Sequence, residues 1–298
     1  GVRRTVGIPG TGLFHTTVHR PGRKPRQGGS EAKVDALDLG FFERLFTPKS
    51  ERAFVDGCRA WVSGDADRAR ATLADALHVA DGAFLRGLLC LRGEELAEAA
   101  IAFRAALRRG RRLGRTFEEY GMTLQAGLWI TEHIEVGVTP DPRAVRLALA
   151  EVHQARGEPE AALQELRRLR SEAPDDPVVR LAIVELLHET RPDDKWLARR
   201  ILDLIGDVEN TSALHAALLY YRGAALRRLG LPTAARDVLT AALRRRKDRP
   251  EALLLAIRYE RALVYEALGP PSRARAEFEK IFARDPDYED VAERLGLD

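Results

Sequence analysis

Small residues recur along the chain at fixed intervals, and this pattern predicts the fold. In four segments a small residue is followed, at intervals of 7, 5, 4 and 3 residues, by a turn glycine, an alanine, a bulky apolar residue and a further apolar residue. A fifth segment keeps the order, with its turn glycine, Gly93, displaced by one position. The sets are Gly57, Gly64, Ala69, Leu73 and Ala76; Gly223, Gly230, Ala235, Leu239 and Ala242; Ala262, Gly269, Ala274, Phe278 and Ile281; Ala150, Gly157, Ala162, Leu166 and Leu169; and Gly87, Ala99, Phe103 and Ala106.

The spacing predicts a helix–turn–helix unit. Two antiparallel helices approach closely only where their side chains are small, so the first small residue and the following alanine mark the contact. The turn glycine permits the left-handed backbone that ends the first helix. We expect the bulky residue to fill the gap to the next unit. Pro174 and Pro286 follow two of the sets and end the second helix there.

These residues resemble the tetratricopeptide repeat, a family built from helix–turn–helix units of about 34 residues. The resemblance implies an all-α fold, an α-solenoid of stacked repeats. The chain departs from the family pattern because its units lack the usual tryptophan at their fourth position and carry Asp56 where leucine is usual. The implied units span about 50–83, 80–113, 143–176, 216–249 and 255–288, with a degenerate unit at about 177–212.

Residues 114–142 do not fit the repeat pattern. The apolar positions from Thr116 to His133 predict one helix, and the following residues to Pro142 read as extended chain. The second helix of a unit is therefore expected to be replaced here, and an eroded repeat is the alternative.

Additional helices are expected at both ends of the repeat array. Residues 288–297 are predicted to form a capping helix with a polar outer face, which an open solenoid needs for solubility. Residues 33–49 are predicted to contain a helix that caps the first unit through Phe41, Phe42 and Phe46.

The N-terminal arm, residues 1–32, is basic and differs in composition from the rest. Alternating apolar and polar positions around a Pro-Gly-Thr-Gly turn predict a β-hairpin at 5–17. That stretch resembles the end of a small, uncharacterised bacterial β-rich domain. Residues 18–32 read as a disordered tether, with contact to membrane phosphates or nucleic acid as the alternative. Because the chain begins with Gly1 rather than Met, we expect a fragment of a longer protein.

The net charge of +3 hides an asymmetry. Residues 1–30 hold six basic and no acidic residues, so the remaining 268 residues, with 42 basic and 45 acidic groups, are net negative. This excludes a uniformly basic, nucleic-acid-binding body. Cys58 and Cys90 fall on equivalent helices about 10 Å apart, too far for a disulfide, so we expect free thiols and a cytoplasmic location. No stretch approaches the ~18 apolar residues of a membrane span.

Nothing in the sequence predicts catalysis, a metal site or a cofactor. The seven histidines are scattered, and no pair has the spacing of a metal-binding motif. No serine lies in a Gly-x-Ser-x-Gly elbow. His153 and Cys90 occupy the same inward position of their units and are expected to pack in the core.

Three arginine clusters each fall at the end of the second helix of a unit. At that end the helix dipole favours cations, by about 0.3–1 kcal/mol each, so their recurrence has a purely structural interpretation. A basic ridge that binds an acidic partner or RNA is the alternative. The clusters are Arg108, Arg109, Arg111, Arg112 and Arg115; Arg167, Arg168 and Arg170; and Arg244, Arg245, Arg246, Lys247 and Arg249.

The family resemblance implies a concave groove, lined by the first helix of each unit, that holds a protein partner. Aromatic residues beside arginines dominate the binding energy of many interfaces. Asparagine is missing at the ninth position of the units, so we expect no clamp for a carboxyl terminus, but an extended or helical peptide of acidic character. The predicted groove residues are Phe54, Trp61, Phe84, Arg92, Glu151, Gln154, Tyr220, Arg227, Arg228, Tyr259 and Glu266.

Three functions remain open at this point. The first is a non-catalytic scaffold that binds a partner protein or peptide. The second is binding of nucleic acid or an acidic partner through the arginine clusters, with nucleic acid less favoured because the body is net negative. The third is a regulatory region of a larger enzyme. The sequence leaves open whether the chain forms a homo-oligomer.

Overall fold

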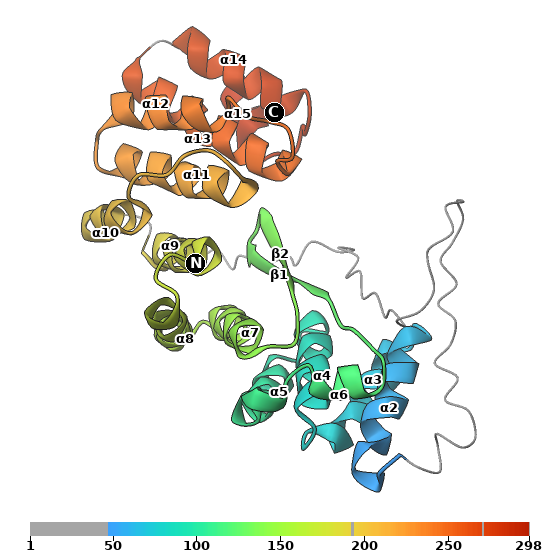
Figure 1. Ribbon diagram of the computed structural model, residues 1–298. Coiled ribbons are helices and arrows are strands. Elements are labelled where there is room, and N and C mark those ends of the chain that lie inside the picture. Colours follow the sequence, from blue (N-terminus) through green and yellow to red (C-terminus); the bar gives the residue numbers. More distant parts are fainter. Residues whose placement is uncertain (1–46, 192–193, 270, 298) are drawn as a thin grey trace. The chain divides into compact units, whose positions relative to one another are not determined.

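The computed structural model describes residues 47–191, 194–269 and 271–297 (Figure 1). The predictions for the arm, its hairpin and the capping helix with its phenylalanines lie outside these residues. The described chain forms two compact units. Unit 1 comprises 47–128 and 137–169, and unit 2 comprises 129–136 and 170–297.

Unit 1 is built from antiparallel helix pairs. Its helices alternate along the chain as expected for helix–turn–helix repeats, so the predicted fold class is confirmed here. Aspartates cap two of them: Asp65 accepts from the backbone N of Arg68, and Asp141 from that of Ala144. The elements are α2 (Lys49–Val62), α3 (Ala66–Leu73), η1 (Ala74–Ala76), α4 (Ala80–Arg92), α5 (Leu96–Arg108), η2 (Gly110–Arg112), α6 (Arg115–Glu119), α7 (Pro142–Ala155) and α8 (Pro159–Glu172).

The segment between α6 and α7 is a β-hairpin, not a continuous helix. Strands β1 (Ala126–Thr131) and β2 (Ile134–Val138) pair across a two-residue turn. The helix predicted to reach His133 ends at Glu119 because Gly121 adopts a left-handed φ of 64°. The prediction of extended chain after it was correct for Ile134–Val138. The fold is thus mostly helical rather than all-α.

Unit 2 repeats the paired-helix arrangement. Helix α11 contacts both α9 and α13, and α10, α12 and α14 each pack against these first helices (Figure 1). Asp176, Asp194 and Ser212 cap the starts of α9, α10 and α11 with side-chain oxygens. The elements are α9 (Pro177–Thr190), α10 (Lys195–Ile205), α11 (Ala213–Arg228), α12 (Pro232–Ala242), α13 (Glu251–Leu268), α14 (Pro271–Phe282) and α15 (Val291–Leu295).

The recurring small residues lie where the two helices of a pair meet. A Cβ atom on Gly57 would lie 2.5 Å from Leu73, and one on Gly223 would lie 2.5 Å from Leu239. Real Cβ atoms do not approach this closely, so an alanine at either position would force the leucine side chain to shift. The bulky residue therefore lies over the glycine of its own pair. The expectation that it fills the gap to the next unit missed this contact.

The turn glycines adopt the backbone predicted for them. Gly64, Gly157, Gly230 and Gly269 have positive φ angles of 84°, 71°, 76° and 98°. In the fifth set the left-handed position is taken by Glu94, with φ 59°. The displaced glycine of that set therefore does not make the turn.

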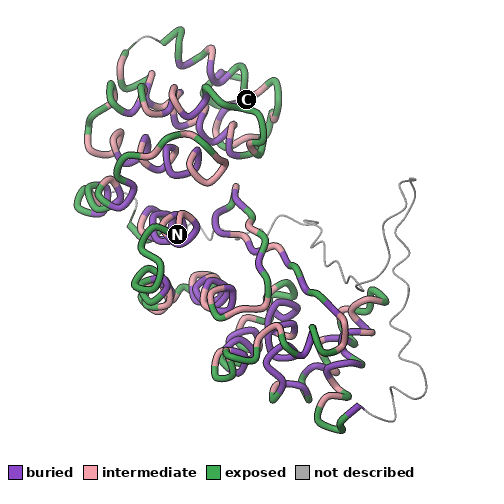
Figure 2. Tube along the Cα trace, in the orientation of Figure 1, coloured by how far each residue is buried: buried purple, intermediate pink, exposed green. Residues whose placement is uncertain are grey.

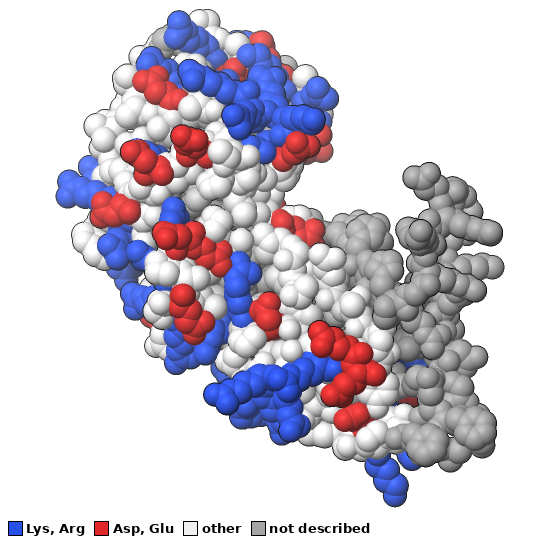
Figure 3. Space-filling view, viewed as in Figure 1, with Lys and Arg blue, Asp and Glu red and all other residues white. Residues whose placement is uncertain are grey.

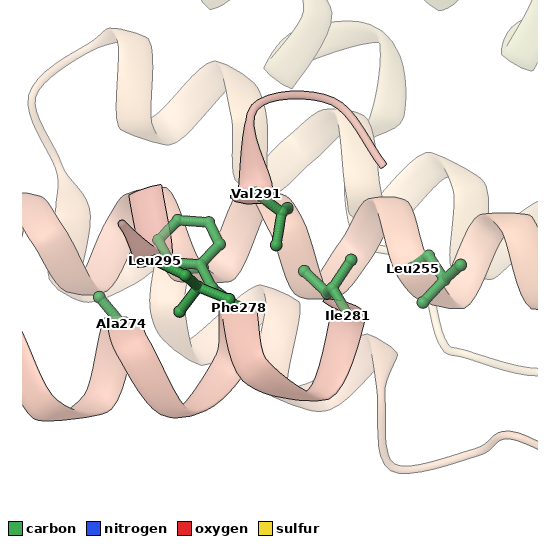
Figure 4. Close-up of a cluster of buried hydrophobic side chains, with 7 residues drawn as sticks. Leu255, Ala274, Phe278, Ile281, Val291 and Leu295 are labelled. Carbon is green, nitrogen blue, oxygen red and sulfur yellow. The ribbon is translucent and has the colours of Figure 1, made fainter. Parts of the chain in front are cut away.

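A short helix closes the C-terminal end of unit 2. Val291 and Leu295 of α15 are buried against α13 and α14, with Phe278 and Ile281 beneath them (Figure 4). The buried positions follow the inner side of each helix, and the outer sides are exposed (Figure 2). The packing of α15 covers apolar surface that the last helix pair would otherwise expose.

Candidate protein-binding surfaces

Two of the predicted groove residues are wholly inside the protein. Phe54 and Phe84 have no exposed surface. The ring of Phe117 in α6 lies edge-on against Phe54 at 5.2 Å, and Tyr120 follows at 6.2 Å. The short helix α6 therefore covers the face of α2 on which Phe54 lies. The prediction that these two phenylalanines contact a partner is wrong, because they belong to the core.

A small pocket lies in unit 1 between the end of α2, the C-terminal half of α4 and the chain that enters β1. Trp61 is half-buried at its rim, and the guanidinium of Arg92 lies over the indole, 5.8 Å from the ring centroid. This cation–π contact joins two predicted groove residues. The floor is apolar and is formed by Leu85, Leu88, Leu89, Leu124 and Ala126.

Part of this floor comes from the segment that the sequence analysis assigned to a helix. Leu124 and Ala126 lie on the chain that leaves α6 and enters β1. Their alternation with Leu128 and Ile130, all buried, is the period of a strand and was a signal available in the sequence.

Two further predicted residues lie on α7 of unit 1. Glu151 and Gln154 are half-buried, and neither lines the pocket. Burial raises the pKa of the Glu151 carboxyl to about 7. No hydrogen bond or ion pair compensates this carboxyl within the described residues.

In unit 2 the predicted residues Tyr220 and Arg228 meet around a histidine. Arg228 donates a hydrogen bond from Nη2 to Nε2 of His188, 2.9 Å away, and the Tyr220 ring lies 6.4 Å from the imidazole. Burial, together with the nearby guanidinium of Arg228, lowers the pKa of His188 to about 3. Because Nε2 accepts a hydrogen bond, the ring is neutral and carries its proton on Nδ1, which is buried without a partner in the described residues.

The turn of the hairpin packs against the same group of side chains around His188 in unit 2. His133 lies edge-on against Tyr220, with ring centroids 6.2 Å apart, and Tyr221 contacts both Tyr220 and His188. Sequence reasoning missed these two histidines. His188 occupies the twelfth position of the degenerate unit, a groove-facing place, so the repeat pattern could have identified it; His133 gave no such signal.

The remaining predicted residues are held by neighbours within unit 2. The guanidinium of Arg227 pairs with the buried carboxylate of Glu260, at 2.5 and 3.2 Å. The hydroxyl of Tyr259 donates to Asp290 at 2.7 Å. Glu266 pairs with Arg294, also at a short distance of 2.6 Å. These contacts join α11 to α13, and α13 to α15 and the residue before it. They leave Arg227 and Tyr259 partly exposed.

No group of three or more His, Cys, Asp or Glu side chains among the described residues is placed to hold a metal ion. Cys58 and Cys90 are free and buried, as predicted, and burial raises the pKa of the Cys90 thiol to about 11. None of the described helices combines the length and apolar character that crossing a membrane requires.

Comparison with protein families decides the classification. Two models described as tetratricopeptide repeat match the chain, one at 143–186 and the other at 56–112 and 199–254. The chain belongs to the tetratricopeptide repeat family. Domains of this kind typically mediate protein–protein interactions and are generally non-catalytic. Among curated proteins, none is significantly similar in sequence.

Solved structures share the fold at low identity. The N-terminal domain of the EccA1 ATPase, from the ESX-1 secretion system of Mycobacterium tuberculosis, aligns over 83% of this chain and 88% of that domain, with 17% identity and a TM-score of 0.59. The assembly chaperone of RpL4, Acl4, aligns over 84% of this chain and 95% of its own, with 13% identity and a TM-score of 0.50. At these identities the similarity concerns the fold alone.

Proposed function

We propose that this tetratricopeptide repeat protein is a non-catalytic scaffold that holds a segment of a partner protein in the pocket of unit 1. The observation that carries the proposal is the apolar floor beneath a rim formed by Trp61 and Arg92. The buried, free Cys58 and Cys90 support a cytoplasmic site of action.

The chemistry of the pocket indicates what the segment carries. Leu85, Leu88 and Leu89 form the apolar floor of a cavity of about 10 Å³, so a small apolar group fits over them. The guanidinium of Arg92 is exposed at the edge and favours a carboxylate next to that group. A large aromatic ring and an arginine are the residue types that contribute most to binding energy.

Selection from a library of random displayed peptides tests this function. We expect the enriched peptides to combine a small apolar residue with a neighbouring Asp or Glu. Their affinity, measured by titration calorimetry, should fall about tenfold or more in the Trp61→Ala, Arg92→Gln double variant. The matched control is Trp196→Ala with Arg199→Gln, since these side chains are exposed on α10 and do not line the pocket. Equal affinity for the wild type and the pocket variant would count against the proposal.

The second candidate is a regulatory region of a larger enzyme. Its support is the similarity of fold to the N-terminal domain of an ATPase. The complete coding sequence tests it, since the candidate requires a catalytic domain in the same polypeptide.

A further inference from the structure

The five arginines between residues 108 and 115 are exposed, and none of their side chains has an ion pair or hydrogen bond within the described residues. Together they form the arginine loop. Arginines elsewhere are commonly neutralised: Arg86 pairs with Glu98, and Arg146 with Glu165. The members of the arginine loop are Arg108, Arg109, Arg111, Arg112 and Arg115.

The helix dipole does not account for this cluster. Only Arg108 and Arg109 lie at the end of α5, where a cation is favoured. Arg111 and Arg112 are in η2, and Arg115 is the first residue of α6, where the dipole disfavours positive charge. The structural interpretation offered by the sequence therefore fails for three of the five.

The two other arginine clusters differ. Arg168 pairs with Glu165 at 2.9 Å, and Arg249 donates a hydrogen bond to Asn210 at 3.2 Å. In the arginine loop no member has such a partner, although Glu118 and Glu119 of α6 follow it closely in the sequence.

A buried side chain beneath the arginine loop holds its backbone in place. The fully buried carboxylate of Asp81 accepts hydrogen bonds from the backbone N of Gly114 at 2.6 Å and from that of Phe117 at 3.0 Å. Gly114 adopts a left-handed φ of 85°, and Gly110 lies against Pro142. A rigid backbone reduces the entropy lost when the side chains bind a ligand.

The charged surface is separate from the pocket of unit 1. Asp81 is at the start of α4 and Arg92 at its end, eleven residues or about 16 Å along the helix axis. A group of Lys and Arg atoms lies over α5 and extends toward α6, where Asp and Glu atoms gather (Figure 3).

We propose that the arginine loop binds an acidic segment of a partner protein, at a site distinct from the pocket. Guanidinium groups form paired hydrogen bonds with carboxylates, and several lie within one short loop. The charge around the loop favours a short acidic segment over a nucleic acid. Glu118 and Glu119 are exposed directly after it on α6. Without the five arginines and the six basic residues of 1–30, the chain has 37 basic and 45 acidic residues, so a long polyanion would be repelled beyond the loop.

Binding of fluorescein-labelled decaglutamate, followed by fluorescence anisotropy, tests the proposal. The test variant changes all five arginines of the loop to Gln. The control variant makes the same charge change at exposed arginines outside the loop that have no partner within the described residues: Arg167, Arg170, Arg199, Arg200 and Arg273.

We expect decaglutamate to bind the wild type at about 50 mM NaCl and more weakly at about 300 mM, because salt screens exposed charges. The loop variant should bind about tenfold or more weakly, and the control variant within about twofold. Equal losses in the two variants, or no binding by the wild type, would overturn the proposal. So would tighter binding of an oligouridylate of about 20 nucleotides that the loop variant abolishes, since the partner would then be a nucleic acid.

Circular dichroism melting shows whether the variants are folded. If the five-site variant is unfolded, the triple variant Arg109→Gln, Arg111→Gln, Arg112→Gln replaces it, with Arg167, Arg170 and Arg199 changed in its control. The triple loop variant must then bind decaglutamate more weakly, and its triple control must bind it as the wild type does.

Discussion

Arg228 donates a hydrogen bond to Nε2 of His188, with the two nitrogens 2.9 Å apart. The imidazole of His188, on α9, is therefore held in its neutral form against Tyr220 and Tyr221 of α11. The family resemblance predicted Tyr220 and Arg228 as independent contacts for a partner, but this histidine joins them.

The pKa of His188, lowered to about 3, predicts how unit 2 responds to acid. The unfolded chain takes up the proton near pH 6.5 and the folded chain near pH 3, so His188 contributes stability that is complete above about pH 6.5 and is lost as the pH falls toward 3. We expect the free energy of unfolding to fall more steeply for the wild type than for His188→Gln, by up to about 1.4 kcal/mol per pH unit. Urea unfolding between pH 4 and 8 measures this difference. Parallel profiles would show that His188 titrates normally.

Glu151 predicts a pH dependence of the opposite sign. Burial raises the pKa of its carboxyl to about 7, so the folded chain holds a proton that the unfolded chain releases near pH 4.5. Stability should therefore decrease as the pH rises from about 4.5 to 7. Glu151→Gln removes the cost of the buried charge, and we expect it to raise the free energy of unfolding by about 1–2 kcal/mol at pH 8 and to change little at pH 4.5. Glu160→Gln, at an exposed site on α8, is the control.

The contact between Gly223 and Leu239 predicts a non-additive pair of substitutions. A Cβ on Gly223 would overlap the Leu239 side chain at 2.5 Å, so Gly223→Ala should destabilise the protein by about 1–3 kcal/mol although alanine favours helices. In a Leu239→Ala background the overlap is absent, and Gly223→Ala should then be neutral or stabilising. A double-mutant cycle from urea unfolding measures the coupling. Equal effects of Gly223→Ala in both backgrounds would contradict the packing described.

The same contact shows why the sequence predicted the repeats so well. The glycine, the bulky residue over it and the turn glycine each satisfy a local steric requirement, which leaves a fixed spacing in the sequence. Each pair of helices has the same steric requirement, so the same spacing of small and bulky residues recurs along the sequence.

The hairpin and the inner surfaces were harder to predict because tertiary contacts decide them. Phe117, Tyr120, Leu124 and Leu128 are spaced like one face of a helix, yet Gly121 ends the helix and the later residues enter a strand. Burial of Phe54 depends on α6 returning to α2 from more than sixty residues away. No local pattern encodes that return.

Asp81 predicts a loss of stability confined to one part of unit 1. Asp81→Ala would leave the backbone N–H groups of Gly114 and Phe117 without their acceptor, and we expect the free energy of unfolding to fall by about 2–4 kcal/mol. Hydrogen exchange at these two amides should accelerate. Asp75→Ala, at an exposed position of η1, is the control and should stay within about 0.5 kcal/mol of the wild type. Unchanged protection of Gly114 would contradict the anchoring role.

The link from Asp81 to Gly114 also bears on how interaction-defective alleles are interpreted. A genetic screen for loss of association could recover Asp81, although its side chain is wholly enclosed and cannot touch another molecule. Such an allele would act by loosening the chain that displays the guanidinium groups. Its phenotype would then weaken on cooling, whereas the defect of an allele that removes an arginine would persist at every temperature.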